Sequence, residues 1–159
     1  DYICLMAYDQ HWGQGSGEGS VAALNWVEEG IDNTIAEGIP ANQIVLGMPF
    51  YTKLWNLTPT SDDSAVEQSY MIGFQNLGLT SAKNWMNTNI SEPTWLDDCG
   101  QWYGEVTKNG VIYKMWLEDK DSLEQKLSLM QDKGLAGAAF WSSELDNSEA
   151  WDVIIKYIN

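Results

Sequence analysis

Three apolar runs of strand length stand out along the chain. They are 2–8, 43–51 and 135–141. Each run is apolar almost throughout rather than alternating, which is typical of parallel strands buried on both faces by helices. In the first run Cys4, Met6 and Tyr8 share one face, because successive side chains of a strand point to opposite faces. The pattern therefore predicts a parallel sheet covered by helices.

Segments with helical periodicity alternate with these runs. One helix is predicted over 20–37, where apolar residues recur every four positions and Gly38 follows as a stop signal. A second is predicted to begin at Asp121, which forms a capping-box pattern with Glu124. A third is predicted over 148–158. The order of strands and helices indicates an α/β layer.

The middle of the chain breaks this alternation. Residues 53–92 are rich in Ser, Thr, Asn and Asp and are predicted to be irregular. Residues 93–117 contain two strand-like segments on either side of Asn109-Gly110, a strong hairpin signal. We therefore expect a small antiparallel insertion before the last strand. The predicted division is 1–52 and 118–159 for the α/β part and 53–117 for the insertion lobe.

A three-stranded parallel sheet on its own would leave two apolar edges without a neighbour. Natural domains cover such edges, so the sheet is expected to pair with something else or to be one section of a larger barrel. The chain also begins inside a strand-like run, which suggests that the earlier strands precede residue 1. We expect this chain alone to self-associate through its open edges or apolar faces.

Composition narrows the possible partners. The 159 residues are 44% hydrophobic, enough for one core, and carry a net charge of −15. All eight basic residues are lysines, so nucleic acid and anionic membrane surfaces are poor partners. No apolar stretch approaches the roughly 18 residues of a membrane span.

The sequence indicates no metal and no organic cofactor. Its two cysteines, Cys4 and Cys99, and its single histidine, His11, are too few for a zinc site. A disulfide between the cysteines requires close Cα atoms, which leaves that pairing open, and two free thiols are the favoured interpretation.

Each apolar run ends in polar or aromatic residues. The first ends in Tyr8-Asp9, the second in Phe50-Tyr51 and the third in Trp141. In a (β/α)₈ barrel the active site lies at the carboxyl ends of the strands, so this convergence indicates a site.

Structural alternatives stay open for these residues. Tyr8 could be a core residue, Asp9 could cap the following loop and Trp141 could be plain packing. His11 and Trp12 could be ordinary loop residues. The acidic pair Glu118-Asp119 is interpreted as a helix entrance, which the helix dipole favours.

Five segments taken together resemble glycoside hydrolase family 18, the chitinases and related enzymes active on N-acetylglucosamine. They are LMAYDQHW, SVAALNWVEEGI, IVLGMPFYTKLW, YKMWLED and GLAGAAFW, in that order along the chain. The resemblance implies a (β/α)₈ barrel (TIM barrel), of which this chain holds strands six, seven and eight with their helices. It also implies that Trp95, Trp102, Tyr103 and Trp116 in the insertion form a wall beside the substrate groove.

The resemblance implies a role for each site residue. The Met-x-Tyr-Asp motif of the family falls on Met6, Tyr8 and Asp9. The resemblance implies that Tyr8 hydrogen-bonds the N-acetyl group of the substrate, that Asp9 helps to hold the catalytic acid and that acetamido group, and that Met6 binds substrate. Trp141 falls on the tryptophan beneath the sugar whose bond breaks, and Tyr51 on a substrate-contacting tyrosine. Where the family often has arginine, this chain has Lys53, which puts a bidentate contact there in doubt.

One element of the family pattern is absent from the sequence. No segment matches the Asp-x-x-Asp-x-Asp-x-Glu motif, whose glutamate is the proton donor. In this family the acetamido oxygen of the substrate is the nucleophile, so there is no second protein carboxylate that acts as nucleophile. We therefore expect the C-terminal fragment of a retaining glycosidase acting on N-acetylglucosamine polymers, either chitin or peptidoglycan-like, and inactive alone.

Two other functions remain open. A non-catalytic lectin on the same fold would keep the groove and lose the glutamate. An α/β interaction module would use its aromatic residues only as core. If the resemblance holds, the parent is expected to be secreted or at the cell surface, as in bacterial enzymes of this type.

Overall fold

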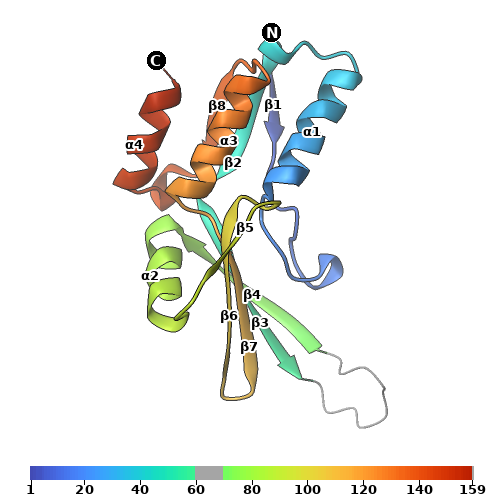
Figure 1. Ribbon diagram of the computed structural model, residues 1–159. Helices are drawn as coiled ribbons and strands as arrows, with labels where there is room; N and C mark the ends of the chain where they lie inside the picture. The colour runs from blue at the N-terminus through green and yellow to red at the C-terminus, as the bar shows by residue number, and fades with distance from the viewer. Residues whose placement is uncertain (60–69, 159) are drawn as a thin grey trace.

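Two β-sheets organise the residues that this computed structural model describes, 1–59 and 70–158 (Figure 1). The parallel sheet has the order β1-β2-β8, and the antiparallel sheet has the order β4-β3-β7-β6-β5. The strands are β1 (Ile3–Met6), β2 (Ile44–Pro49), β3 (Tyr51–Pro59), β4 (Tyr70–Gly78), β5 (Thr94–Leu96), β6 (Gln101–Lys108), β7 (Val111–Leu117) and β8 (Gly137–Trp141). The helices are α1 (Leu24–Ala36), α2 (Leu79–Asn89), α3 (Lys120–Asp132) and α4 (Ser148–Tyr157), with short 3₁₀ turns η1 (Gln14–Ser16), η2 (Ala41–Gln43) and η3 (Ser143–Leu145).

The three apolar runs form the parallel sheet as predicted, with β2 in its centre. Helices α1, α3 and α4 gather beside this sheet, and their apolar faces share one core with it (Figure 1). That core includes the fully buried side chains Val27, Ile31, Leu46, Leu123, Leu127 and Ile154. The helical periodicity in the sequence therefore identified the residues that cover this face.

The expectation that β1 is buried on both faces is wrong. The side chain of Met6 is 67% exposed, and Ile3 and Cys4 are exposed as well. Within the described residues β1 pairs only with β2, so one edge and one face of the strand stay open. The apolar run was correctly assigned to a strand, but the segment that would cover its second face is not among the described residues.

The expectation that 53–92 is irregular is also wrong. This stretch contributes to β3 and β4 and contains α2, although residues 60–69 lie outside the described part. One polar residue of this stretch, Lys53, is buried in β3, and its ammonium donates a hydrogen bond to Asp9 Oδ1 at 2.6 Å. A strand can therefore be polar in sequence where its polar side chains find hydrogen-bond partners.

The predicted hairpin in the antiparallel sheet is confirmed. Asn109 and Gly110 have φ values of 51° and 78°, as a tight two-residue turn requires, and they connect β6 to β7. The sheet itself begins earlier than expected, since β2 passes through Phe50 directly into β3 at Tyr51. The division into an α/β part and a separate insertion lobe stays a prediction.

Two helix starts differ from those expected. Helix α1 begins at Leu24, after an extended N-cap residue, Ala23, and Ser20 Oγ donates to Gln101 Oε1. Helix α3 begins at Lys120, and its capping box pairs Asp119 with Ser122 rather than Asp121 with Glu124. Asp119 is thus the helix entrance that the sequence suggested.

Both cysteines are free thiols, as the favoured interpretation had it. None of the helices in the described part of the chain is long and apolar enough to cross a lipid bilayer.

Candidate functional site

A cavity of about 290 Å³ lies where the carboxyl ends of the parallel strands meet the antiparallel sheet. It is lined by Asp9, Trp12, Tyr51, Lys53, Phe74, Asn76, Trp141 and Leu145. Asp9 follows β1, Tyr51 and Lys53 belong to β3, and Trp141 ends β8. The convergence that the strand ends predicted is therefore present in the fold.

Asp9 is the polar centre of this cavity. Its Oδ1 accepts a hydrogen bond from the Tyr51 hydroxyl at 2.8 Å and another from the Lys53 ammonium at 2.6 Å. The Asp9 backbone has a φ of 59°, in the left-handed region that is uncommon for residues other than glycine. Two side chains of β3, in the antiparallel sheet, thus hold the carboxylate of Asp9, which follows strand β1 of the parallel sheet.

The side chains of Lys53 and Tyr51 are both buried, so they interact with protein groups around them rather than with solvent. The Lys53 ammonium lies 5.1 Å from the centroid of the Tyr51 ring and 5.2 Å from that of Phe74, within cation–π range of both. Burial, and then the hydrogen bond to the Asp9 carboxylate, raise the pKa of the Tyr51 hydroxyl above its usual value. Tyr51 therefore remains a hydrogen-bond donor at physiological pH.

Aromatic rings supply much of the remaining cavity wall. The side chains of Trp141 and Trp12 are 61% and 60% exposed, and Phe74 is partly exposed. Flat exposed rings beside a few polar groups are suited to stacking on a neutral ring-shaped ligand. The wall can thus combine stacking with hydrogen bonding from one carboxylate and its neighbours.

The glycine-rich loop after β1 holds Trp12 in place. A Cβ atom at Gly15 would lie 2.7 Å from Cη2 of Trp12, and one at Gly19 would lie 2.4 Å from Cδ2 of His11. The absence of side chains at these glycines lets the loop fold back onto both rings. The sequence left the role of His11 and Trp12 open; the structure places Trp12 in the cavity and His11 against the backbone of its own loop.

The inner face of the parallel sheet lines a second, more apolar cavity of about 320 Å³. Its walls are Cys4, Met6, Tyr8, Gly47, Ala139, Phe140 and Trp141. Trp141 belongs to both cavities, so the two are neighbours. Burial, with smaller contributions from the charges of Cys4 and Asp9, raises the pKa of the Tyr8 hydroxyl. The predicted site residues therefore divide, with Met6 and Tyr8 in this cavity and Asp9, Tyr51 and Lys53 in the other.

A sequence model of a known protein family matches most of this chain. The model described as glycosyl hydrolases family 18 matches residues 1–146. The chain belongs to glycosyl hydrolase family 18. The resemblance noted in the sequence is therefore confirmed.

Three relatives show how much of a family 18 protein this chain covers. It is 23% identical to the uncharacterized glycosylase YvbX of Bacillus subtilis, over 98% of this chain and 42% of that protein. It superimposes on the spore cortex-lytic enzyme SleL of Bacillus cereus with a TM-score of 0.81 and 18% identity, over 100% of this chain and 35% of that one. With human YKL-39, described as a pseudo-chitinase with retained chitooligosaccharide binding, the TM-score is 0.77 at 20% identity, covering 99% of this chain and 50% of that one.

The chain thus spans half or less of these three relatives. Its fold is part of a family 18 TIM barrel, in which parallel strands and their helices are combined with an antiparallel sheet. The fold class expected from the sequence is confirmed by these matches.

Sequence reasoning missed part of the wall of this family 18 cavity. Phe74 and Asn76 lie on β4, inside the stretch expected to be irregular, and Asn76 pairs in register with Lys53. The rings expected to form a wall beside the substrate groove pair as Trp95 with Trp102 and Tyr103 with Trp116 and are not among the residues that line this cavity, so their role stays a prediction. The two-residue spacing of Phe74 and Asn76 was the available signal, because alternate strand residues share a face.

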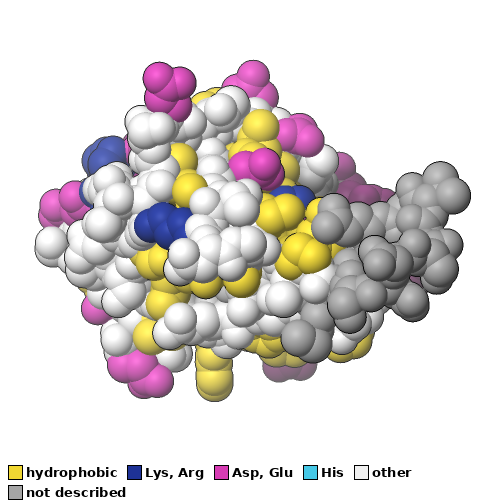
Figure 2. Space-filling model, turned by 90° about the horizontal axis from the view of Figure 1, so that it is seen from below, with side chains coloured by type: hydrophobic (Ala, Val, Ile, Leu, Met, Phe, Trp, Pro, Cys, Tyr) yellow, Lys and Arg dark blue, Asp and Glu magenta, His cyan; other side chains and the backbone are white. Residues whose placement is uncertain are grey.

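The positive charges of this family 18 chain are largely paired. Each lysine except Lys108 forms an ion pair with Asp or Glu, and the Lys108 ammonium donates to the Asn89 side chain. In the view of Figure 2 acidic side chains lie around the outline of the molecule, and hydrophobic side chains form patches between them. This surface favours an uncharged ligand over a polyanion.

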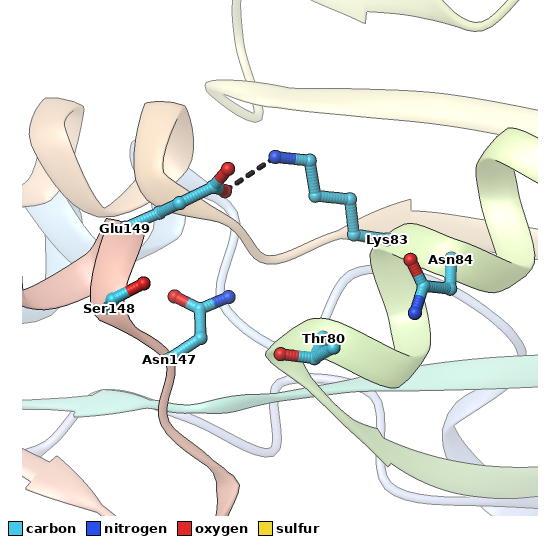
Figure 3. Close-up of a pocket in the computed structure, with 6 residues that line it drawn as sticks. All are labelled: Thr80, Lys83, Asn84, Asn147, Ser148 and Glu149. Carbon is cyan, nitrogen blue, oxygen red and sulfur yellow. Dashed lines mark hydrogen bonds and ion pairs between the residues drawn. The ribbon is translucent and has the colours of Figure 1, made fainter.

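A third cavity, of about 270 Å³, lies between α2 and α4 (Figure 3). In Figure 3 Lys83 extends from α2 to Glu149 on α4, with which it forms an ion pair. The Asn147 side chain accepts the Ala150 backbone N–H and so caps α4. These polar groups join two helices. Among the described residues no cluster of three His, Cys, Asp or Glu side chains is arranged to hold a metal ion.

Proposed function

We propose that this chain forms one wall of the substrate groove in a retaining, substrate-assisted glycosidase that hydrolyses N-acetylglucosamine-containing polymers. The observation that carries the proposal is the cavity in which one carboxylate, Asp9, lies among the exposed rings of Trp12, Phe74 and Trp141. The substrate is chitin or a peptidoglycan-like polymer. The description of SleL as cortex-lytic and of YKL-39 as binding chitooligosaccharides supports a saccharide of this class.

Each site residue then has a specific task. Trp141 packs beneath the sugar whose glycosidic bond breaks, and Tyr51 contacts the same sugar beside Asp9. Tyr8 donates to the acetamido oxygen, and the upward shift of its pKa is consistent with a protonated hydroxyl in that role. Asp9 holds the acetamido group in place, and Met6 fills the apolar floor next to Tyr8.

The proton donor comes from outside this chain in our proposal. Asp9, the carboxylate in the cavity, accepts hydrogen bonds from the Lys53 ammonium and the Tyr51 hydroxyl, and these contacts favour the role of an acceptor for it. The sequence contains no Asp-x-x-Asp-x-Asp-x-Glu segment. We infer that the rest of the barrel supplies the acid and the remaining strands, and that the 159 residues alone do not hydrolyse glycosides.

The parent protein is proposed to act outside the cell or at its surface, because a polymer such as chitin or a cell-wall glycan is found there. This location is tested by fractionating cells that express the natural gene and probing for the protein.

Binding is tested first on this chain. Titration with N,N′,N″-triacetylchitotriose is expected to change the tryptophan fluorescence, and Trp141→Ala is expected to abolish most of that change. No response in the wild type, with tryptophans already shielded from quencher, would favour the interaction-module alternative. Release of product from a chromogenic chitobioside by this chain would contradict its expected inactivity.

Catalysis is tested in a longer protein that contains this chain. Asp9→Asn is expected to lower turnover by about 10²-fold or more, because it removes a group that stabilises charge at the reacting centre. Wild-type turnover in that variant would return Asp9 to a loop-capping role.

A lectin is the second candidate function. It is supported by YKL-39, which is described as a pseudo-chitinase with retained chitooligosaccharide binding. The longer protein discriminates the two, because a lectin binds chitooligosaccharides with similar affinity yet releases no product from them.

A further inference from the structure

The most asymmetric feature of the site is the way in which Asp9 is bound. Within the described residues both side-chain donors to Asp9, Tyr51 Oη and Lys53 Nζ, take the same oxygen, Oδ1. Both donors come from β3, two positions apart, so they lie on one side of the carboxylate. This arrangement fixes one oxygen and leaves Oδ2 for another donor.

We propose that Lys53 is a positioning residue that locks Asp9 in one rotamer, so that Oδ2 accepts a hydrogen bond from an N–H or O–H group of the bound sugar. The role toward the sugar rests on the function proposed above. The locking itself rests only on the contacts within this chain. A saccharide fits such an acceptor because it is uncharged and rich in hydrogen-bond donors.

Lys53 is placed to lock a partner rather than to bind the ligand itself. Its side chain is 3% exposed, whereas that of Asp9 is 50% exposed. The ammonium is enclosed by the Tyr51 and Phe74 rings, and the backbone is held because Lys53 pairs with Asn76 in the sheet. An ion pair gains most when one partner is already immobile, since less side-chain entropy is lost.

Asp9 needs such a lock because, among the described residues, the Tyr51 hydroxyl is the only other side-chain donor to its carboxylate. It follows β1, an edge strand of the parallel sheet, and precedes a glycine-rich loop. A half-exposed aspartate at the end of an edge strand would otherwise sample several staggered rotamers. A buried ammonium at 2.6 Å, a charge-assisted contact, selects one of them.

The locking is tested without any ligand. Three-bond couplings of the Asp9 β-protons, measured by NMR, are expected to show one χ1 rotamer in the wild-type chain. Lys53→Met is expected to give averaged couplings, and Lys53→Arg to restore a single rotamer. Tyr51→Phe is the matched control, because it removes the other donor to Oδ1 and is expected to keep the single rotamer. Averaged couplings in the wild type, or a single rotamer in Lys53→Met, would overturn the proposal.

The consequence for binding is tested by a double-mutant cycle with chitotriose. Lys53→Met is expected to weaken binding about tenfold, the effect of losing one well-placed hydrogen bond. In an Asp9→Asn background the same change is expected to have no further effect, because Lys53 acts through Asp9. Additive effects would instead show that Lys53 contacts the sugar and would overturn the positioning role.

These outcomes separate the two proposals. If a longer protein that contains this chain binds no chitotriose while the Asp9 couplings respond as expected, the proposed function fails and the locking stands. Circular dichroism and thermal melts check that each variant is folded. If Lys53→Met does not fold, Lys53→Leu takes its place, since it also removes the ammonium and leaves no side-chain hydrogen-bond donor at this position.

Discussion

The two sheets of this molecule differ in how completely their side chains are covered. In the antiparallel sheet Trp55 and Met115 are fully buried, and Trp55 Nε1 donates to the Gly19 carbonyl at 2.7 Å. In the parallel sheet the inward-facing Met6 and Trp141 are mostly exposed. Side chains of the covered sheet, such as Lys53, are therefore immobilised by their surroundings. Side chains of the open sheet form the surface that a ligand or a partner can reach.

The largest effect on stability is expected at the buried ion pair between Glu118, which follows β7 of the covered sheet, and Lys126 on α3. Lys126 Nζ lies 2.9 Å from one Glu118 carboxylate oxygen and 3.1 Å from the other, and neither side chain is exposed. Burial raises the pKa of Glu118, and the ammonium of Lys126 opposes that shift. Lys126→Met leaves a buried carboxylate without its counter-charge and is expected to cost about 3–5 kcal/mol of unfolding free energy in urea titrations.

The matched control for this pair lies on the surface. Lys156→Met removes the exposed ion pair with Glu124 and is expected to cost less than about 1 kcal/mol. Equal costs for the two variants would show that the Glu118–Lys126 pair contributes no more than a surface pair.

The reactivities of Cys99 and Cys4 compare a partly buried thiol with an exposed thiol on the open sheet. Burial, and the carboxylate of Asp98, raise the pKa of the Cys99 thiol to about 11, whereas Cys4 on the open sheet is exposed. Since only the thiolate reacts, alkylation of Cys99 by iodoacetamide at pH 8 is expected to be about a hundredfold slower than that of an unperturbed thiol. Peptide mass spectrometry measures both rates in one sample. Equal rates in the folded chain, matching those in urea, would contradict the assigned burial.

A pair of tryptophan substitutions compares the two sheets directly. Trp55→Phe loses volume in a closed core and leaves the Gly19 carbonyl unpaired, so it is expected to cost about 2 kcal/mol of stability. Trp141→Phe, at an exposed position, is expected to change stability by less than about 0.5 kcal/mol. Urea titrations followed by circular dichroism give both values. A cost at Trp141 equal to that at Trp55 would mean that the open sheet is covered in solution.

Self-association of the chain remains a prediction, and the open sheet is where it is expected. Tyr2, Ile3 and Met6 are exposed on β1 and at its start. Sedimentation velocity is expected to show a dimer whose fraction rises with concentration. Met6→Glu is expected to raise the dissociation constant about tenfold, since it places a charge on a face that the dimer would bury. A monomer at all concentrations would contradict the predicted self-association.

The sequence predicted the parallel part of the fold better than the antiparallel part. Residues 44–49 and 137–141 are apolar runs, and such a pattern depends on few distant contacts. In contrast, Thr52 and Lys53 are buried because Glu118 and Asp9, each more than 40 positions away, provide their partners. Residue types alone could not show those partners.

The candidate site was predictable to a similar extent. Asp9, Tyr51 and Trp141 were found because each follows an apolar run, and Lys53 because of the family resemblance. Phe74 was missed, since its place in the wall depends on the pairing of β4 with β3. Lys126 was also missed as a core residue, because its burial depends on Glu118 eight positions earlier, beyond the reach of a helical pattern.

A single stretch of backbone, residues 44–59, runs through both sheets with only Phe50 between them. The Phe50 ring stacks on Phe140 with centroids 4.6 Å apart, and its backbone N–H donates to the Trp141 carbonyl at 2.7 Å. Tension applied to one sheet therefore passes along this stretch into the other, where it loads the hydrogen bonds to the neighbouring strands in shear. Under a stretching force the molecule is expected to yield as one mechanical unit, and the load crosses between the sheets beside the cavity that holds Asp9.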